Sequence, residues 1–162
     1  MILARAARAL ALPGQPEAGL GAIEEAAAGL VGHRLFTVLV LDEARDRNRR
    51  FHSSHPAEYP VSGYKPINRE SEFYRVVVQA GEARFCRDRA EVIRAFPDHE
   101  LIFSLGCEGA VNMPVRWDGR TLGSLNLLHR AGHYGPAQLP ELTILAALSV
   151  APLLRILESP GP

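Results

Sequence analysis

The sequence predicts an α+β fold, with helices on both faces of a central antiparallel sheet. Two apolar stretches give the strongest strand signals, residues 35–41 and residues 111–129, and Asp118-Gly119 divides the second. An Asp-Gly pair between apolar runs is typical of a two-residue hairpin turn, because both turn positions need positive φ. Strands joined by hairpins form antiparallel sheets, and most of the remaining segments have helical spacing.

The composition fits a single globular domain. The 162 residues are 47% apolar and 22% charged, enough for one sizeable core. Lys and Arg total 18 and Asp and Glu total 18, a balance that argues against a protein built to bind nucleic acid or an anionic membrane. No continuous apolar run approaches the roughly twenty residues that span a bilayer. A cytoplasmic location is therefore expected.

The first third of the chain predicts an arm, a helix and a strand pair. Residues 1–16 are expected to be an N-terminal arm that ends at a Pro- and Gly-rich stretch. Residues 17–31 have apolar side chains at helical spacing, and residues 35–41 form an apolar run typical of a central strand. A charged turn follows, and residues 49–54 are expected to be the returning strand.

The middle of the chain predicts a long loop and then short elements. Residues 55–67 contain three prolines and a glycine, which favours a loop that acts as a lid or binding segment. Residues 71–79 predict a helix and residues 83–86 a short strand. Asp88-Arg89-Ala90-Glu91 is typical of a capping box at the start of a helix that ends at Ala95. Another short helix is expected over residues 98–105.

The hairpin register determines which side chains share a face. With a two-residue turn, Trp117 faces Arg120, and counting onward places Asn112 and Asn126 on opposite faces, so at most one of them lines any single cavity. Pro114 opposite Gly123 is expected to mark a weakened or bulged pairing. The site predicted below depends on this register. An apolar helix over residues 140–157, ended or kinked at Pro152, completes the chain.

The element order and one stretch of sequence resemble the GAF domain family of small-molecule sensor modules. The stretch consists of Pro114-Val115, Gly119 and Leu122-Gly123-Ser124-Leu125. The resemblance implies one GAF domain over residues 17–157, with helices on both faces of the sheet, after the arm (1–16) and before a tail (158–162). It further implies a pocket on the sheet face away from the terminal helices. Since no output domain follows, a stand-alone module that signals through a separate partner is expected.

The resemblance also implies a homodimer formed through the terminal helices. The apolar residues that would supply its surface are Leu20, Ile23, Leu30, Leu142, Leu145, Leu148 and Leu153. The alternative is that these residues pack on the sheet of their own chain.

The predicted ligand-binding set combines the long loop with the walls implied by the resemblance. Tyr59 and Tyr64 would close over a ligand, Phe103 would form an apolar wall, and Glu108 and Asn112 would orient polar groups, with Cys107 beside them. Each has a simpler interpretation. A loop tyrosine can pack on its own prolines, a buried Asn can bond a bulged backbone, and Cys107 can be a small buried hydrophobe.

Two alternative functions remain open. The methionine sulfoxide reductases that act on free methionine have a GAF fold, and their nucleophilic Cys stands in a place comparable to Cys107. However, Met113-Pro114 and Asn126-Leu127-Leu128 replace the acids expected there. The other alternative is a ligand-free dimerisation or interaction module.

Several other functions are excluded or left undefined by the sequence. The motif of cyclic-nucleotide-binding GAF domains is absent, as is a Gly-rich phosphate loop with Lys. His52 and His55 lack metal-site spacing, so no metal is expected. The sequence predicts a non-catalytic sensor and identifies neither its ligand nor any cofactor.

Overall fold

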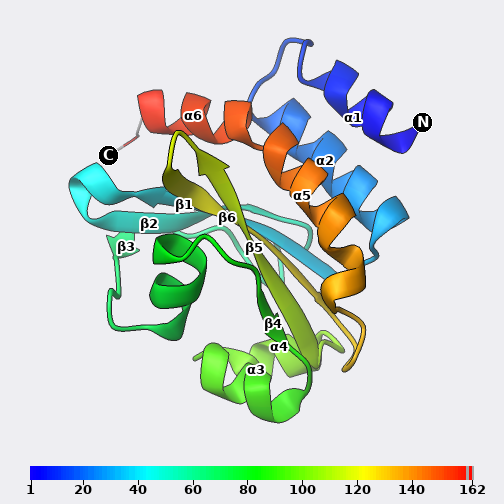
Figure 1. The fold of residues 1–162 in the computed structure, drawn as a ribbon, viewed down its shortest axis with the longest axis vertical. Helices are drawn as coiled ribbons and strands as arrows, with labels where there is room; N and C mark the ends of the chain where they lie inside the picture. Colours follow the sequence, from blue (N-terminus) through cyan, green and yellow to red (C-terminus); the bar gives the residue numbers. More distant parts are fainter. Residues whose placement is uncertain (160, 162) are drawn as a thin grey trace.

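A computed structural model describes residues 1–159 and 161 and places six strands in one antiparallel sheet (Figure 1). Its strand order is β3-β2-β1-β6-β5-β4. The strands are β1 (Leu35–Asp42), β2 (Arg47–Ser53), β3 (Lys65–Pro66), β4 (Arg84–Cys86), β5 (Gly109–Trp117) and β6 (Arg120–His129). The predicted α+β class is confirmed.

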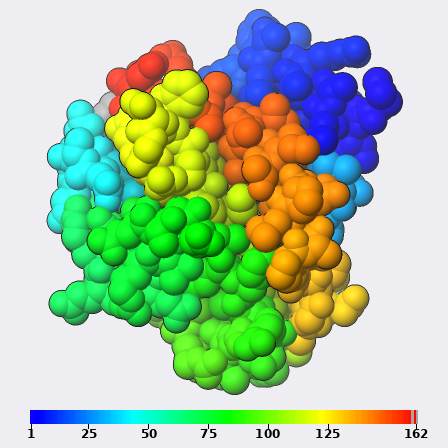
Figure 2. All heavy atoms as spheres, viewed as in Figure 1, coloured from blue at the N-terminus to red at the C-terminus, as the bar shows by residue number. Residues whose placement is uncertain are grey.

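Four helices lie on one side of the sheet. They are α1 (Ile2–Ala9), α2 (Glu17–Leu30), α5 (Leu139–Leu148) and α6 (Val150–Glu158). Phe36, Val38, Val111 and Leu125 belong to the same core as buried side chains of these helices, because alternate strand residues point to the same face. In the space-filling view, α5 (orange) lies directly beside the blue N-terminal helices (Figure 2).

Shorter elements cover the opposite face. They are the π-helical segment η2 (Tyr74–Gln79), α3 (Arg89–Ala95) and α4 (His99–Ser104). The start of α3 forms as predicted, since the Asp88 side chain accepts a hydrogen bond from the Glu91 N–H at 2.9 Å. A smaller apolar cluster, including Leu35, Val92 and Ile102, joins α3 and α4 to the sheet. Two 3₁₀ turns, η1 (Glu43–Arg45) and η3 (Pro136–Gln138), complete the described elements.

The predicted C-terminal helix is interrupted at Ser149, which separates α5 from α6. Pro152 lies three residues further on and has no N–H to continue the helical ladder, which explains the break near the predicted position. The segment Pro136–Glu158 as a whole is long and apolar enough to cross a membrane by length and composition, contrary to the expectation from continuous apolar runs. This is weak evidence for a span, because Leu142, Leu145 and Leu153 are buried in the core against the sheet.

The start of β2 and the segment predicted as a loop both differ from the sequence prediction. Strand β2 begins at Arg47 rather than at residue 49, because Asp46 adopts a left-handed conformation (φ 51°) that ends the turn early. The predicted loop contains the two-residue strand β3, which pairs with Arg47 and Asn48.

The register predicted for the β5–β6 hairpin is wrong beyond Val115. The turn forms as expected, with Trp117 opposite Arg120 and Arg116 opposite Thr121, but Val115 then pairs with Gly123. Leu122 is thus an extra residue in β6, a β-bulge close to the predicted disruption. The insertion shifts the pairing by one residue, so Asn112 lies opposite Asn126 and both side chains point to the same face.

Most residues proposed for a dimer surface pack within their own chain. Leu20, Ile23, Leu142, Leu145 and Leu153 are each 0% exposed. Leu148 is half-buried, and Leu30 is the only member of that set that is exposed.

Candidate functional site

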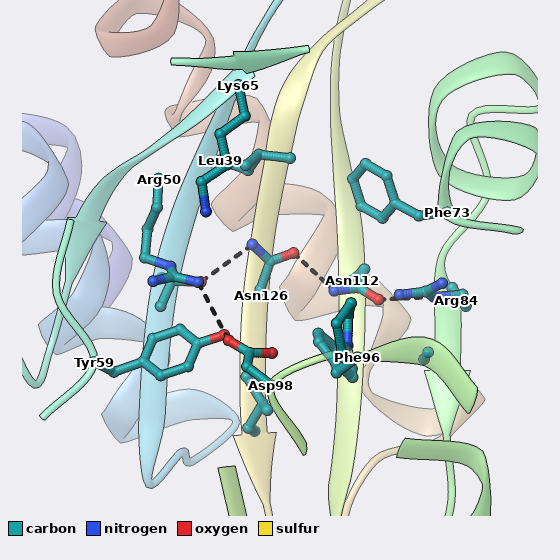
Figure 3. Close-up of a pocket in the computed structure, with 14 residues that line it drawn as sticks. Leu39, Arg50, Tyr59, Lys65, Phe73, Arg84, Phe96, Asp98, Asn112 and Asn126 are labelled. Carbon is teal, nitrogen blue, oxygen red and sulfur yellow. Dashed lines mark hydrogen bonds and ion pairs between the residues drawn. The ribbon is translucent and has the colours of Figure 1, made fainter. Parts of the chain in front are cut away.

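A cavity of about 370 Å³ lies over the sheet face away from the terminal helices, where the resemblance placed a pocket. Thr37, Leu39, Asn112, Asn126 and Leu128 of three adjacent central strands contribute to its lining. The remaining lining residues are Arg50, Tyr59, Lys65, Phe73, Arg84, Ala95, Phe96, Pro97 and Asp98. Figure 3 shows the labelled side chains gathered around this space.

A chain of side-chain hydrogen bonds crosses four adjacent strands beneath the cavity (Figure 3). Arg84 Nε on β4 donates to Asn112 Oδ1 on β5 at 2.9 Å, and Asn112 Nδ2 donates to Asn126 Oδ1 on β6 at 2.8 Å. Asn126 Nδ2 in turn donates to Thr37 Oγ1 on β1 at 3.2 Å. Ser124 Oγ adds a second hydrogen bond to Asn126 Oδ1 at 2.9 Å. All five side chains belong to residues that are at most 9% exposed.

Arg84 fixes the direction of this chain. A guanidinium group only donates hydrogen bonds, so Asn112 must present its oxygen to Arg84 and its nitrogen to Asn126. Asn126 then presents its oxygen to Asn112 and its nitrogen to Thr37. The second N–H of each amide has no partner among residues 1–159 and 161. Both amides therefore have a hydrogen-bond donor to spare, while Asn126 Oδ1 accepts two hydrogen bonds and Asn112 Oδ1 accepts one.

Arg84 is a buried cation without a paired carboxylate in the described part of the chain. It is 6% exposed, and Nε makes its one hydrogen bond there. Burial lowers the pKa of its guanidinium, and the electrostatic influence of Cys86 and then of Glu72 offsets only part of this. The guanidinium carbon lies 5.5 Å from the ring centre of Phe73 and 5.6 Å from that of Phe96. A buried charge with free donors is costly unless something pairs with it.

The other side of the cavity has its own polar cluster. The Arg50 guanidinium carbon lies 3.7 Å from the ring centre of Tyr59, and Arg50 Nη1 donates to the Pro60 carbonyl at 2.7 Å. Arg50 Nη2 also lies 3.7 Å from Asp98 Oδ2. Burial, and then the hydrogen bond with Asp98, raise the pKa of the Tyr59 hydroxyl, which stays protonated at neutral pH. These contacts fix the positions of Arg50 and Tyr59 in the cavity lining.

The structure brings two of the six predicted site residues, Tyr59 and Asn112, to this cavity. Tyr64 lies elsewhere, with Arg47 3.8 Å and Arg49 4.9 Å from its ring centre. Phe103 packs against the smaller apolar cluster beneath Arg89. Glu108 pairs with Arg89 at 3.1 Å.

Cys107 is a core residue of the smaller apolar cluster and is 0% exposed. Burial raises the pKa of its thiol to about 11, so the thiolate needed for nucleophilic attack is scarce at neutral pH. Burial also raises the pKa of the Cys86 thiol. Both thiols are free, and neither lines the cavity.

Sequence reasoning missed Arg84, Asp98 and Asn126 as members of the site. The predicted register allows only one of Asn112 and Asn126 to line a cavity, whereas the observed register brings both to it. Arg84 had a usable signal, because it alternates with Phe85 in a short apolar strand and therefore had to share a face with the buried Cys86. Asp98 is the first residue of the short helix expected over residues 98–105, and no local pattern marks it as a cavity residue.

No metal centre is present among residues 1–159 and 161, where no group of three His, Cys, Asp or Glu side chains is arranged to hold an ion. His52 instead pairs with Glu24 at 2.6 Å on the helical face.

No family model matches the sequence, and no curated protein matches it either. Solved structures do match the fold. The GAF domain of an Acinetobacter phosphoenolpyruvate-protein phosphotransferase is 16% identical with a TM-score of 0.77, over 99% of this chain and 95% of that one. The GAF domain of a two-component sensor histidine kinase from Bacillus halodurans is 14% identical with a TM-score of 0.67, over 85% and 92%.

A third match is free methionine-R-sulfoxide reductase from Neisseria meningitidis in complex with its substrate. It is 16% identical with a TM-score of 0.69, over 94% of this chain and 86% of that one. Structural similarity at sequence identities this low shows a shared fold only, so the function has to be argued from the residues of the site. The chain therefore has the fold of GAF domains.

Proposed function

We propose that this chain is a cytoplasmic sensor module that binds a small organic molecule in the cavity over the sheet and signals through a separate partner protein. The observation that carries the proposal is the cavity itself, whose floor combines apolar side chains with spare hydrogen-bond donors. Ligand sites in proteins are mostly apolar hollows with a few placed polar groups, and about 370 Å³ falls in their size range.

Two further observations support a binding role over catalysis. The solved structures of similar fold include the GAF domain of a sensor histidine kinase. The described cavity lining contains no thiol, and Cys107, the candidate nucleophile, is enclosed in the core. As part of the same proposal, the module forms a homodimer through the exposed surface of α2 and α5.

A cavity-filling variant tests the proposal. Ala95 lines the cavity at the end of α3, whereas Ala90 on the same helix is exposed and outside it. Ala95→Trp should block binding, and Ala90→Trp should leave it intact. Native mass spectrometry of protein purified from cells should show a small-molecule adduct on the wild type and on Ala90→Trp, and none on Ala95→Trp.

A compound library screened by NMR provides the second measurement. Binding should shift the side-chain amide signals of Asn112 and Asn126. If no adduct co-purifies and no compound shifts either signal, the proposed function is wrong and an interaction module without a ligand takes its place.

A further inference from the structure

We propose that the ligand is a small organic acid whose carboxylate binds the guanidinium of Arg84. This inference rests on the proposed function and specifies the chemical class of the molecule. Arg84 is 6% exposed, lines the cavity, and makes one hydrogen bond in the described part of the chain. Its two terminal nitrogens are left to a partner that enters the cavity.

The hydrogen-bond inventory of the floor favours a ligand rich in acceptors. Asn126 Oδ1 already accepts two hydrogen bonds and Asn112 Oδ1 accepts one from the Arg84 cation, so the free N–H on each amide outnumbers the one acceptor position left on Asn112. Thr37 Oγ1 accepts a hydrogen bond and donates none among the described residues, so its hydroxyl hydrogen is also free. A carboxylate accepts several hydrogen bonds and donates none, which makes it the complement of this floor.

The charges around the cavity favour an anion. Arg50, Lys65 and Arg84 line it, and Asp98 is the one carboxylate among the described lining residues. Asp98 lies beside Arg50, which leaves Lys65 and Arg84 without an ion pair among the described residues. Lys65 extends from β3 into the space above Asn126 in Figure 3. An anion bound here would be held from two sides.

The shape of the site favours a carboxylate on an organic body over inorganic phosphate. Phe73 and Phe96 lie near the Arg84 guanidinium, and Leu39 and Leu128 continue the apolar lining. The edge of a guanidinium matches a planar carboxylate with two parallel hydrogen bonds. The apolar walls need an apolar group to cover them, which inorganic phosphate lacks.

Matched pairs of acids and their neutral amides test the inference. The probes are benzoate against benzamide, 4-methylpentanoate against 4-methylpentanamide, and succinate against succinamide, with inorganic phosphate as a separate arm. Each is titrated into the full chain up to about 10 mM, which reaches the weak binding expected of small probes. The readout is the shift of the side-chain amide signals of Asn112 and Asn126. At least one acid should bind about tenfold or more tightly than its amide, and phosphate should not bind.

Three variants separate the role of Arg84 from general charge. Arg84→Gln removes the charge and should weaken binding of the acid about tenfold or more. Arg84→Lys keeps the charge but loses the bidentate geometry, so its affinity for the acid should lie between those of the wild type and Arg84→Gln. Lys65 is exposed, so Lys65→Gln should fold even if the Arg84 variants do not. It should also weaken binding of the acid. Arg89 pairs with Glu108 outside the cavity. Arg89→Gln is therefore the matched control and should bind the acid as the wild type does.

The outcomes distinguish this inference from the proposed function. Amides that bind as tightly as their acids, or an acid that binds Arg84→Gln and Lys65→Gln unchanged, overturn the acid assignment and leave a ligand-binding cavity. Phosphate that binds more tightly than every acid overturns it in favour of a phosphorylated ligand. If no probe and no library compound shifts either amide signal, the proposed function fails together with the inference.

Discussion

Asn112 donates a hydrogen bond to Asn126 Oδ1 at 2.8 Å directly across the β5–β6 pair, inside the sheet. Each of the two also has a second strand as a partner, Arg84 on β4 for Asn112 and Thr37 on β1 for Asn126. The pair is therefore the middle link between the edge of the sheet and its centre.

Replacing either Asn by Leu should lower the free energy of unfolding by about 1–3 kcal/mol, because the buried polar group opposite loses its partner. The double variant should cost less than the sum of the two, since the shared hydrogen bond is lost only once. Urea unfolding of the wild type and the three variants measures this coupling. Additive costs would show that the two amides contribute independently.

Gly123 should be intolerant of any side chain. A Cβ there would overlap the carbonyl oxygen of Leu39 on β1 and lie 2.8 Å from Leu153 Cδ2 of α6. Gly123→Ala should therefore destabilise the fold by about 3 kcal/mol, the upper end for overpacking. Gly21→Ala in α2 is the matched control, because a Cβ there meets nothing within 4 Å and a helical Gly→Ala change should stabilise by about 0.5–1 kcal/mol. In thermal unfolding, the melting temperature should fall for Gly123→Ala and rise for Gly21→Ala. Equal changes in the two variants would refute the steric argument.

The turn and the bulge show how far the sequence could predict the site. Asp118 and Gly119 take φ values of 49° and 74°, as the Asp-Gly pair predicts. Pro114 and Gly123 do not lie opposite each other as predicted, since they pair with Ser124 and Val115, but the disruption falls close to them, between Val115 and Arg116. The size of the disruption was not predictable, because it depends on Gly123 approaching Leu39 on a strand far away in sequence. One inserted residue reverses every side chain beyond it, which is why Asn126 was assigned to the wrong face.

The cavity walls were harder to predict for a related reason. Elements far apart in sequence bring Tyr59, Phe96 and Asp98 to the same space, and no local pattern specifies how α3 and α4 pack. Residues such as Cys107 and Glu108 are close in sequence to the cavity strands but point to other neighbours. Local structure was therefore predictable, whereas the composition of the site depended on tertiary packing.

His129 should make the fold less stable in mild acid. Burial, and then the stacked His133 ring 3.9 Å away, lower its pKa from 6.5 to about 4. Between those values the unfolded chain binds a proton that the folded chain does not, so stability is full above about pH 6.5 and falls as the pH drops toward 4. In the wild type, the Arg130 N–H donates to His129 Nδ1 at 2.8 Å. His129→Asn removes the titrating ring but keeps an acceptor for this N–H. Urea unfolding from pH 7 to 4 should show a shallower slope for the variant, and identical slopes would contradict this assignment.

The proposed homodimer should depend on Ile144. This side chain is 44% exposed on α5, and Leu30 is 36% exposed on the adjacent α2. Light scattering after size exclusion should give twice the chain mass for the wild type and a monomer for Ile144→Asp, because a carboxylate in an apolar interface is costly. Ile93→Asp on α3, where the side chain is 49% exposed over the other sheet face, should remain dimeric. A wild type that is monomeric at every working concentration rejects the dimer.

Cys107 provides the test between a binding module and a redox enzyme. The thiol is 0% exposed, and burial raises its pKa from 9.0 to about 11, which alone lowers the thiolate fraction about 100-fold at neutral pH. In a Cys86→Ala background, which leaves one thiol, an aromatic disulfide reagent should therefore react at pH 7 at least about 100-fold more slowly with the folded chain than with the chain in denaturant. A folded-state rate equal to that of an ordinary exposed thiol would require an opening that brings Cys107 to solvent as a thiolate. That result would favour the redox alternative, because a nucleophile must be both ionised and accessible.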